Sequence, residues 1–281
     1  MVTVHEAIAS ATIELNETGI DSSWLDARLL LMDAIGFSRE DLLLKFDEVL
    51  TDTQRLQFAA LVDRRKTREP VSRILGQREF WSMSFKINDQ TLDPRPDSES
   101  LVEACLGLRQ DLPDEPSVLD LGTGSGCLLL SLLSEWPEAT GVGVDRSEGA
   151  VLAAIENSEA LDFNVRSSFF VGDWCRGLDQ KFDLIISNPP YIAGSEMAGL
   201  EPEVTNFDPF SALVAAEGGY SDFRKIINQA PAVLGDGGYL VFEHGHEQQT
   251  DLESMLLASG WRVVDKRCDL AGAPRVIIAQ L

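Results

Sequence analysis

Hydrophobic and polar positions change their spacing along the chain, and the change divides it into parts. From residue 1 to about 70, apolar residues recur at helical spacing, as in 24–31 and 42–44. Amphipathic stretches here follow a hydroxyl residue that has an acid or amide three positions later, the pattern of a capping box. The sequence therefore predicts a small helical bundle. Its expected capping pairs are Thr3 with Glu6, Ser23 with Asp26, Ser38 with Asp41, and Thr51 with Gln54.

Glu69-Pro70 ends the helical pattern, and a different pattern follows. Residues 80–87 are aromatic and roughly alternating, as in a hairpin strand. The proline-rich stretch 93–98 is expected to be extended and to lead into a helix over about 98–109. We predict a helical domain over 1–70, a hairpin connector over 71–92 and a second domain over 93–281. The helical domain has no polar cluster suited to catalysis, so we expect it to dock a partner.

After Pro116 the pattern alternates between short apolar runs and amphipathic helices. Such alternation predicts an α/β fold with a doubly wound, mostly parallel sheet, in which ligands bind at the carboxyl ends of the strands. The seven expected strands are 118–121, 142–145, 169–171, 184–187, 239–242, 261–264 and 276–279. The expected helices are 127–135, 148–160, 223–234 and 248–258.

Charge limits the class of partner. Among 281 residues, 23 are Lys or Arg and 46 are Asp or Glu, which gives a formal net charge of -23. Such an acidic surface repels phosphate backbones, so free duplex DNA is a disfavoured substrate and no stable nucleic-acid binding is expected. One basic run is either a local basic patch or a solvated helix end with its loop. It consists of Arg64, Arg65, Lys66, Arg68, Arg73 and Arg78.

Cysteine and histidine spacing give no sign of a disulfide framework or a metal site. His244 and His246 are close together, but no third ligand completes a site, so we expect no metal. No apolar run approaches the ~20 residues of a membrane span, and no export signal is visible, so we expect a cytoplasmic protein. The widely spaced cysteines suit a reducing compartment. They are Cys105, Cys127, Cys175 and Cys268.

A glycine-rich turn, Gly122-Thr123-Gly124-Ser125-Gly126, follows the strand expected at 118–121. The dinucleotide fingerprint G-x-G-x-x-G would need glycine at Cys127 or Leu129, so the spacing argues against NAD. A tight G-x-G-x-G turn instead lets the backbone approach a ligand without phosphates, such as the methionine part of S-adenosylmethionine. The alternative is a strand-to-helix turn with no ligand.

Acidic residues follow the next two strands. Asp145 comes about twenty residues after the glycines, where it can accept both hydroxyls of a ribose. The alternative role of Asp145 is to cap the next helix. Asp173 offers an acceptor for an adenine amino group, and Trp174 offers a wall for the ring. A capping Asp beside a surface Trp is the alternative here. Together with the glycines, these residues favour an adenosine-containing cofactor.

The tetrapeptide Asn188-Pro189-Pro190-Tyr191 directly follows the strand expected at 184–187. The Asn188 side-chain oxygen can accept one N–H and the Pro189 carbonyl another, which would hold a planar NH2 group for alkylation. Tyr191 offers a flat face to such a group. A simple strand-end turn is the alternative. These residues predict a methyltransferase and leave glutamine and adenine open as substrates.

The motifs together resemble the class I S-adenosylmethionine-dependent methyltransferases, and more closely the release-factor glutamine N5-methyltransferases, the HemK/PrmC family. The resemblance covers nearly the full chain. Small departures are Ser98, where the family often has Thr, and Arg73, where Gln or Tyr is common. The further matching segments are Pro70-Val71, Ile74-Leu75-Gly76, Glu79-Phe80-Trp81, Pro94-Arg95-Pro96-Asp97, Phe207-Asp208-Pro209, Ala212-Leu213, Glu243-His244-Gly245, Asp269-Leu270-Ala271-Gly272 and Pro274-Arg275-Val276.

The resemblance implies a seven-stranded class I sheet and a role for each site residue. Gly122, Thr123, Gly124, Ser125 and Gly126 would line the methionine and ribose region, Asp145 the ribose, and Trp174 the adenine. The segment from Asn188 to Tyr191, with Asn188 also beside the cofactor, would hold the glutamine of a Gly-Gly-Gln loop in a peptide chain release factor. We expect a monomer that supports translation termination. Rival interpretations are an N6-adenine methyltransferase, which would need base flipping and a cationic groove, and a non-catalytic adenosyl-binding module.

Overall fold

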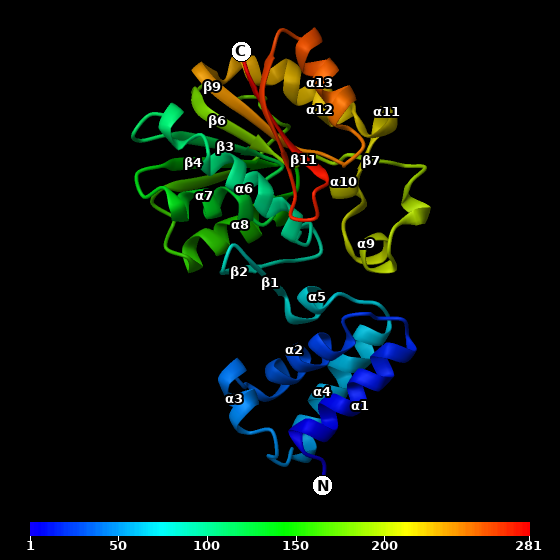
Figure 1. The fold of residues 1–281 in the computed structure, drawn as a ribbon. Coiled ribbons are helices and arrows are strands. Elements are labelled where there is room, and N and C mark those ends of the chain that lie inside the picture. The colour runs from blue at the N-terminus through cyan, green and yellow to red at the C-terminus, as the bar shows by residue number, and fades with distance from the viewer. The chain divides into compact units, whose positions relative to one another are not determined.

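The computed structural model describes residues 1–281, which pack as two units. The first, here called the helical unit, comprises Met1–Gly76 and Glu201–Phe207. The second, the sheet unit, comprises Gln77–Leu200 and Asp208–Leu281. In Figure 1, residues 1–76 run from blue to cyan, and the sheet unit runs from cyan to red. The domain boundaries drawn from the sequence at residues 70 and 92 stay a prediction.

The helical unit is a bundle with one apolar core, as the sequence predicts. Leu15, Leu30, Leu31 and Phe58 are among the side chains buried in that core. The helices are α1 (Val4–Glu17), α2 (Ser23–Ile35), α3 (Arg39–Leu44), α4 (Asp52–Lys66), α5 (Val71–Leu75) and α9 (Pro202–Phe207).

Three of the four expected capping boxes form, and the one at Ser23 is wrong. The N-cap of α2 is Ser22, which makes no side-chain cap bond, while the Ser23 hydroxyl donates to the Asn16 side-chain oxygen at 2.6 Å. The Asp26 carboxylate expected in the box accepts from Arg65 Nε at 2.7 Å. The carboxylate that the local spacing assigned to a helix cap is therefore used in a buried ion pair with Arg65. The boxes that form are those of Thr3, Ser38 and Thr51.

Carboxylates neutralise the basic run within the helical unit. Arg65 is buried and contacts Asp26 at 2.7 Å and Glu203 at 3.0 Å. Arg68 also contacts Glu203, at 2.8 Å. Because these cations are already paired, they argue against a free basic patch for a phosphate backbone. The other pairs of the run in this unit are Arg64 with Glu69, and Lys66 with Glu14 and Asp63.

The sheet unit is built on seven strands, which confirms the predicted doubly wound fold. They are β3 (Ser117–Leu121), β4 (Thr140–Asp145), β5 (Ser167–Val171), β6 (Phe182–Ser187), β9 (Leu234–Glu243), β10 (Arg262–Cys268) and β11 (Pro274–Gln280). Their order across the sheet is β10-β11-β9-β6-β3-β4-β5. Only β11 runs against its neighbours, β9 and β10. The other strands are parallel, so their carboxyl ends meet at one edge.

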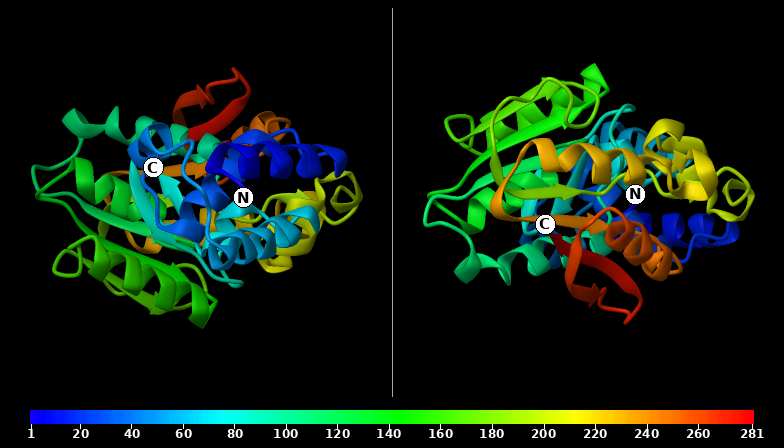
Figure 2. Two further views of the ribbon diagram at one scale, coloured as in Figure 1. Left: turned by 90° about the horizontal axis from the view of Figure 1, so that it is seen from below. Right: turned by 90° about the horizontal axis from the view of Figure 1, so that it is seen from above.

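Helices cover both faces of the sheet (Figure 1, Figure 2). Val118 and Leu184 pack with the helices of one face, whereas Leu119 and Ile185 pack with those of the other. This alternation follows from the two-residue period of a strand buried on both sides. The first face holds α6 (Glu99–Leu106), α7 (Cys127–Glu135) and α8 (Glu148–Ala160), and the second α12 (Ser221–Gln229) and α13 (Gln249–Ala258).

Two elements of the sheet unit differ from expectation. The stretch 80–87 contains a hairpin turn at Trp81 and Ser82, which have φ values of 50° and 59°. The helix expected over 223–234 ends at Gln229, because Pro231 cannot donate a helical hydrogen bond and Leu234 already opens β9. The smaller elements are β1 (Gln77–Phe80), β2 (Met83–Lys86), η1 (Pro96–Ser98), η2 (Arg109–Asp111), β7 (Ile192–Ala193), η3 (Met197–Gly199), α10 (Phe210–Leu213), β8 (Val214–Ala215), α11 (Ala216–Gly219) and η4 (Ala230–Ala232).

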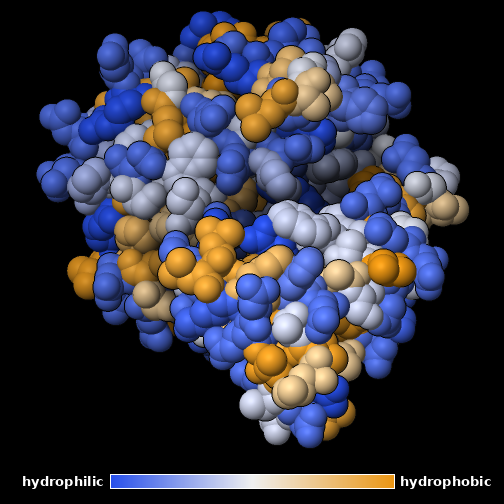
Figure 3. Space-filling model, turned by 60° about the horizontal axis from the view of Figure 1, so that its bottom comes forward, coloured by the Kyte–Doolittle hydropathy of each residue, from blue (hydrophilic) through white to orange (hydrophobic).

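On the face drawn in Figure 3, hydrophilic residues cover most of the surface and hydrophobic residues form separate patches. None of the helices combines the length and the apolar character needed to cross a bilayer. His244 is buried and His246 is exposed, and no group of three or more His, Cys, Asp or Glu side chains is arranged to hold a metal ion. All four cysteines are free, and Cys268 alone is exposed.

Candidate active site

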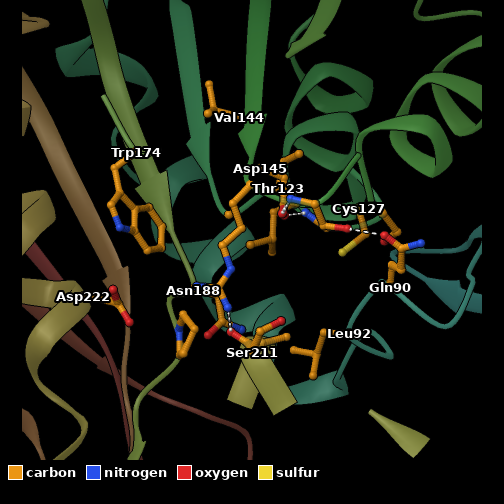
Figure 4. A pocket seen from close by; sticks show the side chains of 18 of the residues that line it. Gln90, Leu92, Thr123, Cys127, Val144, Asp145, Trp174, Asn188, Ser211 and Asp222 are labelled. Carbon is orange, nitrogen blue, oxygen red and sulfur yellow. Dashed lines mark hydrogen bonds between the residues drawn. The ribbon is translucent and has the colours of Figure 1, made fainter. Parts of the chain in front are cut away.

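A pocket opens where β3, β4 and β6 end, and most of the predicted site residues line it. Figure 4 shows Trp174 and Asp222 on one side, Thr123 and Gln90 on the other, and Asn188 between them. The predicted residues in the lining are Gly122, Thr123, Gly124, Ser125, Asp145, Asp173, Trp174, Asn188 and Pro190. Gly126, Pro189 and Tyr191 lie outside the lining. Lining residues that the sequence did not single out for the cofactor include Gln90, Leu92, Ser98, Cys127, Asp222 and Lys225.

The glycine turn between β3 and α7 has a backbone that requires glycine. Gly122 and Gly124 have φ values of 77° and 57°, in the left-handed region that side chains disfavour. A Cβ on Gly122 would lie 3.4 Å from the Trp174 ring, whereas one on Gly124 would meet no protein atom within 4 Å. The turn therefore lets Trp174 approach and leaves open space beside Gly124.

Two buried polar side chains fasten this turn. Asp120, at the end of β3, accepts from the Thr123 hydroxyl at 2.7 Å. Asn157, on α8, donates to the Ser125 carbonyl at 2.9 Å and bonds both the N–H and the carbonyl of Lys86 on β2, at 2.7 and 3.0 Å. The sequence pattern gave no signal for Asn157, since an asparagine inside a helix is usually exposed.

Replacing Asp120 with asparagine is expected to change how stability depends on pH. Burial raises the pKa of Asp120 to about 7 from 3.8, although the hydrogen bond from Thr123 opposes the shift. Between these values the folded state keeps a proton that the unfolded chain has lost, so this group's contribution to stability falls as pH rises. Asparagine does not titrate. In urea unfolding, the stability of Asp120→Asn relative to wild type should therefore increase between about pH 4 and about pH 8. A difference that is constant with pH would contradict this.

Asp145 ends β4 with its carboxylate at the pocket. It accepts from the Gly124 N–H at 3.0 Å and from the Ser147 N–H at 2.9 Å. The N-cap of α8 is Ser147, whose hydroxyl accepts from the Ala150 N–H at 3.2 Å. Asp145 is thus not the cap of the helix, and its position in the lining allows its oxygens to accept ligand hydroxyls.

Trp174 is held in an unusual backbone conformation beside the pocket. Its φ is 54°, and its ring is half-buried against Gly122. Asp173 is exposed and pairs with Arg176 at 3.0 Å. Asp222, near Trp174 in Figure 4, is buried and pairs with Lys225 at 2.7 Å. A positive φ in a bulky residue costs energy, so the conformation is typical of a functional position.

Hydrogen bonds hold both the first and the last residue of the tetrapeptide after β6. Asn188 Nδ2 donates to the Ser98 hydroxyl at 3.3 Å. The Tyr191 carbonyl accepts from Gln248 Nε2 at 3.0 Å, and a Cβ on Gly219 would lie 2.2 Å from that carbonyl oxygen. The Pro189 carbonyl accepts no protein hydrogen bond. The arrangement therefore leaves an acceptor free at Pro189 and fixes Asn188 at the pocket.

The fold and this pocket agree with the family models that the chain matches. Residues 113–266 match the model described as a methyltransferase domain, and residues 6–76 match that of the PrmC N-terminal domain. A solved methyltransferase from Pyrococcus furiosus aligns with a TM-score of 0.50 and 17% identity, over 69% of this chain and 88% of that one. That likeness shows the fold alone. The protein is a class I methyltransferase.

Full-length relatives narrow the class. A release factor glutamine methyltransferase from Rhodospirillum rubrum is 43% identical over 266 residues, covering 95% of this chain and 81% of the relative. Another, from Vibrio cholerae, is 40% identical over 281 residues, covering 99% of this chain and 97% of the relative. The chain belongs to the release factor glutamine methyltransferase family.

Proposed function

We propose that the protein transfers a methyl group from S-adenosylmethionine to the side-chain amide nitrogen, N5, of the glutamine in the Gly-Gly-Gln loop of peptide chain release factors. The observation that carries the proposal is the position of Asn188, which lines the same pocket as the glycine turn and Asp145. The activity stated in the names of its relatives supports the same substrate.

The pocket fits the adenosyl cofactor. When bound, S-adenosylmethionine supplies a methyl group on a positively charged sulfur. Gly124 offers the open space that a Cβ would fill, and Asp145 offers acceptors for ribose hydroxyls. The Trp174 ring supplies a flat apolar wall for the adenine, and exposed Asp173 an acceptor for its amino group. Thr123 and Ser125 would line the side of the methionine part, and Gly126 is the N-cap of α7.

Asn188 and Pro189 would hold the nucleophile. An amide nitrogen attacks poorly because its lone pair is delocalised, so its orientation decides the rate. The Asn188 Oδ1 and the Pro189 carbonyl would each accept one N–H of the glutamine amide, with Pro190 and Tyr191 shaping the adjoining wall. The nitrogen would form its bond to the methyl carbon as the bond between that carbon and sulfur breaks, S-adenosylhomocysteine would leave, and the methylated nitrogen would then lose one proton to water. No strong base is needed, because a cationic N-methyl amide is acidic.

The proposed partner is a protein with a Gly-Gly-Gln loop, and the helical unit is proposed to dock it. Exposed Trp24, Leu25, Leu43 and Leu44 give that unit apolar side chains for such contacts. The net charge of -23 disfavours stable nucleic-acid binding. We further propose a cytoplasmic monomer that supports translation termination.

Methyl transfer from labelled S-adenosylmethionine to three substrates tests the assignment. A purified release factor is expected to acquire label. The same factor with its loop glutamine changed to alanine, and duplex DNA, should not. Equal labelling of the alanine variant would sink the glutamine assignment, and labelling of DNA would favour the adenine alternative.

A further inference from the structure

Glu243 ends β9 beside Asn188. In the register of β6 with β9, Ser187 pairs with Phe242, so Asn188, the first residue after β6, and Glu243, the last residue of β9, follow a directly paired position on two neighbouring strands. Glu243 is 2% exposed, and its Oε2 has no hydrogen-bond partner. A buried carboxyl group with an unsatisfied oxygen at an active site calls for an explanation.

Ser98 interacts with both side chains. The Ser98 hydroxyl accepts from Asn188 Nδ2 at 3.3 Å, and its single proton remains available to Glu243. Ser98 and Asn188 both interact with the Glu243 carboxyl, in the direction that lowers its pKa and favours the ionised form. An ionised carboxylate can only accept, so it draws the NH2 end of the Asn188 amide toward itself.

The orientation of the Asn188 amide decides whether it can hold a substrate. The two ends of the amide are nearly equal in size, but only Oδ1 can accept an N–H. We propose that Glu243, directly and through Ser98, is a positioning residue that keeps Asn188 Nδ2 turned away and Oδ1 free for the substrate amide. This inference rests on the proposed function, because it assigns Oδ1 to the glutamine nitrogen.

Burying the charge of Glu243 lowers the stability of the folded protein, so stability alone would not favour a carboxylate at this position. Burial raises the pKa of Glu243 to about 7, against the lowering effects of Ser98 and Arg275. The other charged or titratable groups that interact with it are Asp97 from η1, Cys127 from α7 and Tyr191 from the segment after β6. A neutral residue of equal size would avoid the burial cost, so the carboxylate points to a role in the site.

A double-mutant cycle between Glu243 and Asn188 tests the proposal through the rate constant of methyl transfer to a release factor. The measurement uses single turnover at about pH 9, where Glu243 is largely ionised. Asn188→Asp alone brings two carboxylates together and should lower the rate constant by about 100-fold. Glu243→Gln alone lets the Asn188 amide adopt both orientations and should cost about 10-fold.

The double variant is expected to recover activity to within about 10-fold of wild type, because the introduced glutamine side chain can donate to one oxygen of the introduced aspartate while the other oxygen accepts the substrate N–H. If the losses instead multiply, to about 1,000-fold, the positioning role is overturned. Ser98→Thr keeps the hydroxyl and should stay active, whereas Ser98→Ala should lose rate constant with little change in KM. A loss in Ser98→Ala that appears only in KM would also overturn the role.

The melting temperature of Glu243→Gln distinguishes a positioning role of Glu243 from an effect on folding. Glu243→Gln removes a buried charge, so its melting temperature should equal or exceed that of wild type at about pH 9 while its rate constant falls. A rate that falls only in step with unfolding would overturn the role. Wild-type transfer is measured first: its absence would overturn the proposed function, and with it this inference, whereas wild-type transfer with multiplied losses overturns the inference alone.

Discussion

Replacing Asn188 with alanine is expected to lower the rate constant for methyl transfer by about 100-fold or more, with S-adenosylmethionine affinity nearly unchanged. The side chain supplies an acceptor that acts on the substrate nitrogen as charge develops on it. Its removal also leaves the Ser98 hydroxyl without the donor now 3.3 Å away. Single-turnover kinetics with a release factor, and calorimetric titration with the cofactor, measure the two quantities separately.

Asn164→Ala is the matched control, because Asn164 is an exposed asparagine of the sheet unit outside the pocket. It should leave both quantities unchanged. A wild-type rate constant in Asn188→Ala would remove Asn188 from the chemistry. A loss confined to cofactor affinity would move it from substrate positioning to cofactor binding.

Replacing Asp145 with asparagine is expected to weaken S-adenosylmethionine binding by about 10- to 100-fold, as charge-assisted hydrogen bonds of roughly 1.5–3 kcal/mol are lost. The carboxylate also accepts from the Gly124 and Ser147 N–H groups, at 3.0 and 2.9 Å, so the glycine turn loses support as well. Titration calorimetry gives the dissociation constant of the cofactor. The melting temperature without cofactor shows how far the loss of support for the glycine turn lowers stability.

Asp183→Asn provides the control for this variant. Asp183 likewise accepts two hydrogen bonds, from the Ser117 N–H at 2.8 Å and hydroxyl at 2.6 Å, but it lies at the opposite end of β6 from the pocket. Asp183→Asn should lower stability without changing cofactor affinity. If Asp145→Asn and Asp183→Asn had the same effect on binding, Asp145 would not contact the cofactor.

The sheet could be predicted because its inner strands, such as β3 and β6, are buried on both faces and form apolar runs in the sequence. Helices α7 and α8 begin and end at the residues that the pattern indicated. One prediction failed where distant residues competed with local spacing. Asp26 pairs with Arg65, 39 positions away, in place of a capping box at Ser23. A second prediction failed for a local reason, because Pro231 and the start of β9 at Leu234 end the helix that was expected to reach residue 234.

The candidate site could also be predicted only in part: residues at strand ends could be found from the sequence, and residues brought in by tertiary contacts could not. Asp145 and Asn188 stand at strand ends, where topology alone brings them together. Gln248 could not be found in this way, because its contact with the Tyr191 carbonyl depends on a three-dimensional approach between segments 57 positions apart. Glu243 appeared in the sequence only as part of a family motif, and its burial beside Asn188 emerged from the register of β6 with β9.

Mass-spectrometric mapping of the methyl group after turnover tests the central claim most directly. A release factor treated with the protein and S-adenosylmethionine should carry one added methyl group on the side-chain amide of its Gly-Gly-Gln glutamine, and Asn188→Ala should leave that residue largely unmodified. A methyl group on any other residue, or an unmodified loop glutamine after prolonged incubation with active protein, would contradict the account.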